Sequence, residues 1–318
     1  MSTATEGIAA GATGAAGAAR TDHALLRHAF RAMGTDVLLV LDAADDHASR
    51  QALRDAEAEM RRIEAVASRF NPSSELSLLN AAGDAEVSAD LLRLITLALA
   101  MRDATGGRFD PTVHEAVVSA GYDRSLDRLP ADAGAAGPAM PAGGDVQVDL
   151  RTGRVTLSQG TCLDLGGIAK GWTADRLADD LGMHGPCLVS LGGDIAVRGL
   201  MTGEPWPVEV MHAADPRVIG LRRGGMATSG TDRRRWTRDG VQMHHVIDPV
   251  TGLPSDTDLL RVTVVADDAA TAEAWATALL VSGSEQGARE AISRGLAAVL
   301  VTRDGRVVTT GSLADGEA

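Results

Sequence analysis

The segment Leu163–Gly171 places an acid, two adjacent glycines and a lysine close together. Asp164 supplies the carboxylate, Gly166-Gly167 a flexible turn, and Lys170 the ammonium group. The next residues, 172–181, have the pattern of a helix, and the N-terminal end of a helix favours bound phosphate. The segment therefore indicates a nucleotide site, although a strand, a turn and a helix carrying a surface lysine would leave the same pattern.

Two further segments combine reactive or small side chains. Met243–Pro254 contains His244, His245 and Asp248 beside a turn rich in proline and glycine. Gly225–Asp232 is a run of small and hydroxyl residues, which lets a ligand approach the backbone closely. Together these segments indicate a binding site that has histidine available for proton transfer.

These three segments resemble the ApbE family of FAD:protein FMN transferases. The resemblance also includes Met33-Gly34-Thr35, Ser68-Arg69-Phe70 and the run from Gly106 to Thr112, and the motifs occur in the family's order between residue 33 and about residue 281. It implies Mg²⁺-dependent transfer of FMN from FAD to a threonine or serine hydroxyl of an acceptor protein, with release of AMP. FAD is then a substrate, and the acceptor carries an FMN-binding domain.

A metal site is predicted on the helix expected over residues 268–282. Glu273 and Thr277 are four residues apart, which places both on one helix face. Carboxylate and hydroxyl oxygens suit Mg²⁺, although an exposed glutamate and a helix-interior threonine are the ordinary alternative. The resemblance adds a backbone oxygen from Gly167, with Ala169 as the less favoured choice. Family members carry aspartate where this chain has Glu273, which moves the carboxylate by about 1.5 Å.

The flavin nucleotide would use several of the motif residues. Asp164 can accept a hydrogen bond from a ribose or an adenine amine, and Lys170 can offset diphosphate charge. The resemblance adds a further set to the FAD site: Met33, Phe70, Arg108, Phe109, Asp110 and Thr228. Phe70 stands where members often carry tyrosine, so stacking is kept and a phenol hydrogen bond is lost. Taken alone, methionine and phenylalanine are more often core residues.

His245 is the predicted general base. A neutral imidazole near the phosphates of FAD can take the proton of an acceptor hydroxyl. His244 is the competitor, and His245 is preferred because it occupies the histidine position of the family's H-x-I-D-P-x-T-G pattern. Asp248 is expected to shape the turn that follows.

Composition limits the classes of partner. The 318 residues carry a formal charge of −13, which argues against a nucleic acid partner. Cys162 and Cys187 are expected as buried thiols. The apolar runs are too short to span a bilayer and the N-terminal residues lack the apolar core of a signal peptide, so a cytoplasmic location is expected.

The predicted elements alternate irregularly, which favours an α+β fold with mixed sheets and packed helices over a doubly wound sheet. A strand pair is expected over 28–41 and a hairpin over 146–157, with further strands over 187–191, 208–211, 260–266, 298–302 and 307–309. Helices are expected over 47–67, 74–80, 89–104, 172–181, 268–282 and 285–295. The run Arg233–Trp236 is expected at a solvated or substrate-facing edge.

We expect a disordered tail over 1–24, one catalytic domain over 25–312 and a short tail over 313–318. The loop over 129–145, rich in alanine, glycine and proline, marks a mobile segment or a lobe boundary. The resemblance implies a two-lobed, T-fold-like architecture. Two other functions fit the same residues: an Mg²⁺-dependent FAD pyrophosphatase that yields FMN and AMP, and a non-catalytic FAD-binding protein.

Overall fold

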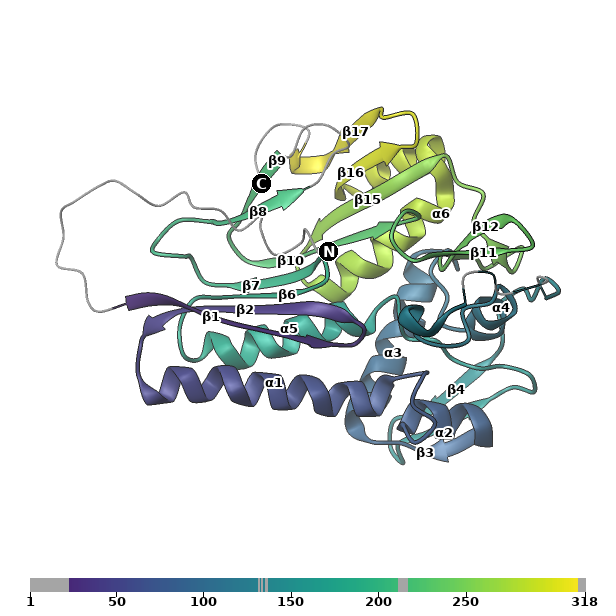
Figure 1. Ribbon diagram of the computed structural model, residues 1–318, viewed down its shortest axis with the longest axis horizontal. Coiled ribbons are helices and arrows are strands. Elements are labelled where there is room, and N and C mark those ends of the chain that lie inside the picture. The colour runs from purple at the N-terminus through teal and green to yellow at the C-terminus, as the bar shows by residue number, and fades with distance from the viewer. Residues whose placement is uncertain (1–22, 131, 133, 135–136, 211–216, 314–318) are drawn as a thin grey trace.

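A computed structural model describes residues 23–130, 132, 134, 137–210 and 217–313 of the chain. Its largest element is an antiparallel sheet of eight strands in the order β1-β2-β6-β7-β10-β15-β16-β17 (Figure 1). The strands are β1 (His23–Ala32), β2 (Thr35–Ala44), β6 (Cys187–Leu191), β7 (Asp194–Arg198), β10 (Gly224–Gly230), β15 (Leu259–Ala266), β16 (Ala297–Thr302) and β17 (Val307–Thr310). The α+β class predicted from the sequence is confirmed.

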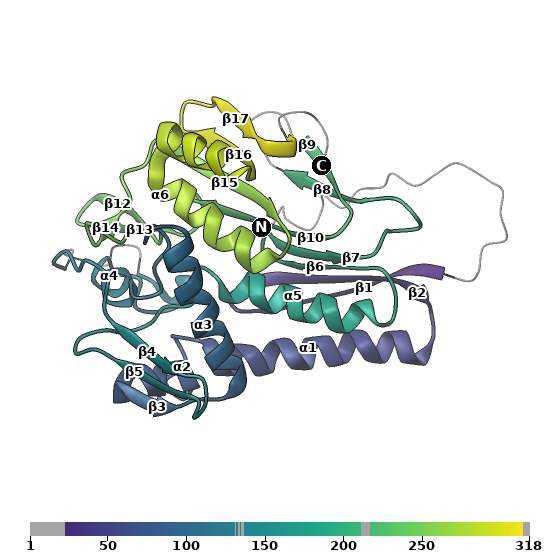
Figure 2. The same cartoon turned by 180° about the vertical axis from the view of Figure 1, so that it is seen from behind.

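Both faces of this sheet are covered. Helices α1 (His47–Ala67), α5 (Ala169–Gly182) and α6 (Ala269–Arg294) lie along one face, and the hairpin of β8 (Trp206–Val210) and β9 (Arg217–Leu221) lies on the other (Figures 1 and 2). In β2, Leu39 and Leu41 pack towards the helices, while Leu38 and Val40 pack towards the hairpin. A strand buried on both faces needs a continuous apolar run, which explains the sequence of 37–41.

The remaining elements form a second region beside α6. Helix α3 (Ala89–Ala104) lies there with α2 (Glu75–Ala82), α4 (His114–Ser119) and a small sheet of order β3-β5-β4. Its strands are β3 (Asp84–Glu86), β4 (Val146–Asp149) and β5 (Arg154–Leu157). The short pairs β11 (Arg235–Arg238) with β12 (Val241–His244), and β13 (Ile247–Asp248) with β14 (Leu253–Pro254), complete the strands, and 3₁₀ turns lie at Leu126–Arg128 and Gly311–Leu313. Whether this region is a separate lobe stays a prediction.

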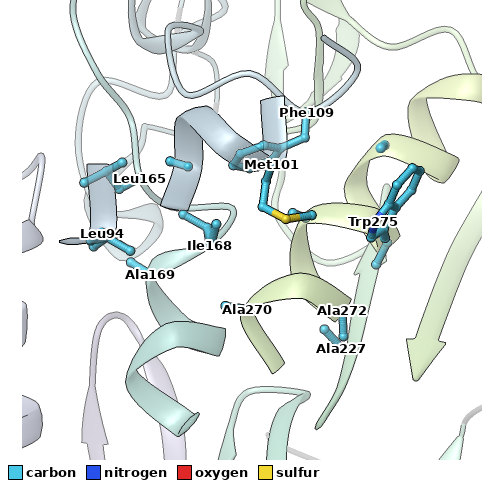
Figure 3. Packing of buried hydrophobic residues seen from close by; sticks show 14 of the residues in the cluster. Leu94, Met101, Phe109, Leu165, Ile168, Ala169, Ala227, Ala270, Ala272 and Trp275 are labelled. Carbon is cyan, nitrogen blue, oxygen red and sulfur yellow. The ribbon is translucent and has the colours of Figure 1, made fainter. Parts of the chain in front are cut away.

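One apolar cluster connects this second region to the main sheet. Met101 of α3, Phe109, Ile168 and Ala270 of α6 belong to it (Figure 3). Ala227 of β10 completes the contact with the sheet. The cluster contains Phe109 itself and the sequence neighbours of Gly167 and Glu273, so its packing fixes these segments relative to one another.

Most predicted helices and strands are present, and the differences have local causes. Helix α1 buries its periodic apolar face, including Leu53, Met60 and Ile63, as expected. Helix α5 begins at Ala169, three residues earlier than predicted, because Ile168 provides no side-chain cap that would mark its start. The six-residue α4 also lacks a side-chain cap, and the sequence did not predict it. The two predicted C-terminal helices form α6, which is interrupted at Gly283, where φ is +76°.

The predicted tails and the loop fall partly outside the described residues. β1 begins at His23, so the boundary predicted at residue 24 was two residues too late, and residues 1–22 and 314–318 lie outside the described residues. The described part of 129–145 contains no helix or strand. It is held by hydrogen bonds, among them Ala142 N–H to the Pro249 carbonyl at 2.8 Å and Gly143 N–H to Thr112 Oγ1 at 2.9 Å. Mobility of this loop stays a prediction. Among the described residues, no helix is both long and apolar enough to cross a membrane.

Candidate active site

A single cleft of about 1120 Å³ contains every residue that the sequence predicts for the site. These residues come from most of the chain's length: Met33, Phe70, Arg108, Phe109, Asp110, Asp164, Gly167, Lys170, Thr228, His245, Glu273 and Thr277. The cleft lies where the start of α5, α6, β10 and the turn between β6 and β7 meet. The structure therefore brings together motifs that are far apart in the sequence.

Lys170, Asp194 and Glu273 form a buried charge cluster that lines the cleft. The Lys170 ammonium contacts both carboxylates, whose side chains are each 4% exposed. Burial opposes the charge of Lys170, but the two carboxylates hold its pKa above the ordinary value of 10.5. Burial, assisted by Asp194, raises the pKa of Glu273 to about 7. The cluster therefore holds one carboxylate more than Lys170 can neutralise.

One predicted metal ligand, Glu273, belongs to this cluster, and the others line the same cleft. Both Glu273 oxygens already accept hydrogen bonds, Oε1 from Lys170 and Oε2 from the Gly171 N–H at 2.8 Å. Thr277 Oγ1 lies 2.9 Å from Ser229 Oγ. A Cβ placed on Gly167 would lie 4.0 Å from Thr277 Oγ1 and 3.2 Å from the Phe109 ring, so the Gly167 backbone packs against these two side chains.

His245 lines the cleft, whereas its neighbour His244 does not. His244 is 8% exposed, and its Nε2 lies 3.2 Å from the Ser255 carbonyl, which is a structural contact. His245 Nδ1 is buried without a hydrogen-bond partner. Burial, followed by the positive charge of Arg234, lowers the pKa of His245 well below 6.5. The imidazole of His245 is therefore neutral at physiological pH, as a general base requires.

The turn that follows His245 requires a glycine at position 252. Asp248 Oδ1 accepts a hydrogen bond from the Val250 N–H at 2.9 Å, so Asp248 shapes the turn as expected. Gly252 has a φ of +67°, and a Cβ there would lie 2.2 Å from the Met140 carbonyl carbon. Glycine is needed because the 129–145 loop passes directly over this turn.

An aromatic and guanidinium stack forms one wall of the cleft. The Arg69 guanidinium lies 4.1 Å from the ring centre of Phe70 and 4.6 Å from that of Tyr122, and Tyr122 stacks on Trp236 at 5.3 Å. Phe70 is 40% exposed, so a flat ligand can reach its ring. Trp236 is 6% exposed, so it departs from the solvated or substrate-facing edge expected for 233–236, whereas Arg233 and Arg234 line the cleft. Its indole N–H donates to the Ala120 carbonyl at 2.9 Å.

Several predicted ligand residues already have partners within the protein. Asp164 pairs with Arg69 at 3.0 Å and accepts from the Gly166 N–H at 2.7 Å. Asp110 pairs with Arg102 at 3.1 Å and accepts from the Thr112 N–H at 2.8 Å. These carboxylates order the cleft wall, and only their remaining lone pairs are available to a ligand.

Other predicted residues lie at the rim or in the core. Met33 adopts a φ of +49° in the turn between β1 and β2, where its N–H donates to Glu64 Oε1 at 2.7 Å. Phe109 is 4% exposed and belongs to the core. Thr228 Oγ1 lies 2.9 Å from Thr263 Oγ1. Arg108 lines the cleft half-buried.

The sequence did not identify Asp194 or Tyr122 as site residues, and it placed Arg234 only within a run at a solvated or substrate-facing edge. Asp194 follows Gly192-Gly193, a two-residue turn with φ values of +66° and +115° that directs β7 back along β6. An acid directly after such a turn is the signal that the sequence offers. Arg234 is half-buried and its charge acts on His245, whereas Arg233 is exposed. Because both belong to a run of three arginines, the sequence does not show this difference in burial.

A model of the ApbE family matches residues 33–300. The chain belongs to the ApbE family. A relative from Treponema pallidum named FAD:protein FMN transferase is 35% identical over 305 residues, covering 86% of this chain and 82% of the relative. One of the same name from Klebsiella pneumoniae is 32% identical, covering 82% of this chain and 79% of the relative.

Solved structures of this family have the same fold. The crystal structure of the ApbE protein of Thermotoga maritima has a TM-score of 0.83 at 28% identity, over 93% of this chain and 100% of that one. The apo flavinyl transferase ApbE of Pseudomonas stutzeri has a TM-score of 0.78 at 23% identity, over 92% and 96%. The family expected from the motifs is confirmed.

Proposed function

We propose that this chain transfers FMN from FAD to a threonine or serine hydroxyl of an acceptor protein that carries an FMN-binding domain, and releases AMP. The names of its relatives support this activity. The observation that carries the proposal is that a neutral His245 shares one cleft with the oxygen donors Glu273 and Thr277. A base and an all-oxygen donor set are what phosphoryl transfer to a hydroxyl requires.

The donor set fits Mg²⁺. Glu273, Thr277 and the Gly167 carbonyl would hold it, and all three donate hard oxygen atoms. The hydrogen bonds to Glu273 leave a further lone pair on each carboxylate oxygen. Bound there, the ion would offset negative charge on the diphosphate of FAD. The Glu273 carboxylate, one methylene longer than the aspartate of the family, contacts Lys170 and lines the same cleft as Thr277.

The acceptor hydroxyl would lose its proton to His245. Nε2 is the ring nitrogen available for this step, because Nδ1 is buried. The hydroxyl oxygen forms a bond to the phosphorus of the riboflavin phosphate, and the bond from that phosphorus to the bridging oxygen breaks. AMP leaves with the bridging oxygen.

Arginines in the cleft would bind the diphosphate. Arg108 and Arg234 line it and make no ion pair with any described residue. In a chain with a net charge of −13, two unpaired guanidinium groups in one cleft indicate an anionic ligand. Phe70 offers a stacking surface for a ring of FAD.

Mass spectrometry of an acceptor domain tests the proposal. The domain is incubated with the chain, FAD and Mg²⁺, and we expect its mass to rise by one FMN minus water. His245→Ala should lower the rate by about 10²–10⁴-fold. His244→Gln is the matched control and should retain most activity, because His244 lies outside the cleft.

Two results would overturn the proposal in favour of the other functions. Steady AMP release with an unmodified acceptor, repeated over a panel of FMN-binding domains, would indicate an FAD pyrophosphatase. Tight FAD binding with no AMP release would indicate a binding protein. The cytoplasmic location expected from the sequence stays a prediction.

A further inference from the structure

A second cluster of metal-binding side chains lies outside the donor set of Glu273 and Thr277. His114, Glu115 and Cys162 place one nitrogen, one oxygen and one sulfur atom all within 4.8 Å of one another. His114 Nδ1 lies 2.9 Å from Glu115 Oε1. None of the three lines the cleft.

The ligand types select the metal. In a tetrahedral zinc site, with bonds of about 2.0–2.3 Å, neighbouring ligand atoms lie about 3.5 Å apart. Small side-chain rotations would bring the three atoms to this spacing. Thiolate and imidazole favour Zn²⁺ and disfavour Mg²⁺, which prefers oxygen. Three protein ligands leave the fourth position to water.

The cluster is accessible to an ion from solvent. The side chains of His114 and Glu115 are 18% and 41% exposed, and Cys162 is half-buried. Burial, with Glu115 acting in the same direction, raises the pKa of the Cys162 thiol to about 11. Without a metal this thiol stays protonated and unreactive, and metal binding would release its proton.

The cluster joins two segments that carry cleft residues. His114 and Glu115 begin α4, shortly after Phe109 and Asp110, whereas Cys162 is two residues before Asp164. The segments already meet through the Asp164 N–H, which donates to the Pro111 carbonyl at 2.8 Å. A metal bound by the three side chains would provide a second connection between these two segments.

We propose that His114, Glu115 and Cys162 form a zinc site, separate from the oxygen-donor set of Gly167, Glu273 and Thr277. Zn²⁺ bound there clamps the start of α4 to the segment before α5. None of the three ligands lines the cleft, and Zn²⁺ bound there would stabilise the folded chain.

Cobalt provides the test, because a cysteine thiolate bound to Co²⁺ gives a charge-transfer absorption that oxygen ligands do not give. The full chain is titrated with CoCl₂ in excess Mg²⁺ and without FAD. We expect one equivalent to bind with this absorption, and ZnCl₂ to displace it. Cys162→Ser should abolish the absorption, and His114→Gln should weaken Co²⁺ binding at least about tenfold. Cys187→Ser is the matched control and should keep the signal, because Cys187 is buried elsewhere with its thiol directed to the Ala178 carbonyl.

The proposal is wrong if no charge-transfer absorption develops, if Cys162→Ser retains it, or if Cys187→Ser removes it. Circular dichroism of each variant verifies folding. Should Cys162→Ser not fold, His114→Gln decides, since unchanged Co²⁺ affinity in that variant excludes the site. No flavin is present, so failure here is distinct from failure of the proposed transferase activity.

Discussion

Glu273 is bound to Lys170 although 103 positions separate them, and both residues line the cleft. Lys170 also contacts Asp194, so one ammonium group serves two buried carboxylates. The same Glu273 side chain is the predicted carboxylate ligand of the metal. The residue therefore connects the start of α5, α6 and the β6–β7 turn to the chemistry of the site.

Removing the Lys170 ammonium group should lower the free energy of unfolding more than removing the carboxylate charge of Glu273. Lys170→Met leaves two buried carboxylates without their cation, and we expect the free energy of unfolding to fall by about 3–5 kcal/mol. Glu273→Gln leaves Lys170 paired with Asp194, and the expected loss is about 1–2 kcal/mol. Urea unfolding of both variants without Mg²⁺ measures the difference. A larger loss for Glu273→Gln would contradict the charge balance described here.

The pH dependence of transfer should follow His245. Its pKa lies well below 6.5 because of burial and the charge of Arg234. At saturating Mg²⁺, which holds the Glu273 carboxylate ionised, the rate should be constant above about pH 6.5 and fall at lower pH. Arg234→Gln removes a positive charge that lowers the pKa of His245, so the pH below which the rate falls should move upward. Arg233→Gln is the control, because that side chain is exposed. If the pH–rate profile of Arg234→Gln is unchanged at low pH, Arg234 does not influence the pKa of His245.

Asp175 should make the protein less stable as the pH rises. Its carboxylate accepts hydrogen bonds of 3.0 Å from the N–H groups of Ala269 and Ala270 at the start of α6, yet burial raises its pKa from 3.8 to about 6. Between these two pH values the folded chain holds a proton that the unfolded chain has released. The contribution of this group to stability is therefore complete below pH 3.8 and lost as the pH rises through 6.

The expected loss is about 3 kcal/mol between pH 3.8 and 7. In Asp175→Asn this part of the pH dependence should be absent, which urea unfolding at several pH values measures. Asp180→Asn removes one charge from an exposed position of the same helix and should keep the wild-type dependence. Equal slopes in wild type and Asp175→Asn would show that Asp175 does not titrate in this range.

Gly171 should not tolerate a side chain. A Cβ there would lie 2.4 Å from the Ala269 carbonyl oxygen, because α5 and α6 cross closely at this residue. We expect Gly171→Ala to lower the free energy of unfolding by about 1–3 kcal/mol, and to weaken Mg²⁺ binding by displacing Glu273. Gly182→Ala, at the other end of α5, would meet the Arg198 side chain at 3.3 Å and should be neutral or stabilising. Calorimetry of both variants tests this, and similar unfolding midpoints would contradict the close crossing.

Local pattern was enough for most elements and for the membership of the site. The 3.6-residue periodicity of α1, the apolar run of β2 and the glycine turns depend on neighbouring residues only, so the sequence specified them. The motif residues that line the cleft were also identified, because their types and order resemble those of the ApbE family. In contrast, α4 and the first turn of α5 lack capping side chains and could not be placed from local signals.

The partners of the site residues depend on contacts between distant segments. Nothing in the sequence near Lys170 shows that Asp194 and Glu273 neutralise it, that Arg69 holds Asp164, or that Trp236 is buried against Tyr122. The proximity of Cys162 to His114 is of the same kind. By itself the sequence determined the family, most of the strands and helices, and a set of residues that all line one cleft. Only the tertiary structure decided which charges are paired, because burial and pairing arise when elements distant in sequence pack together and exclude water.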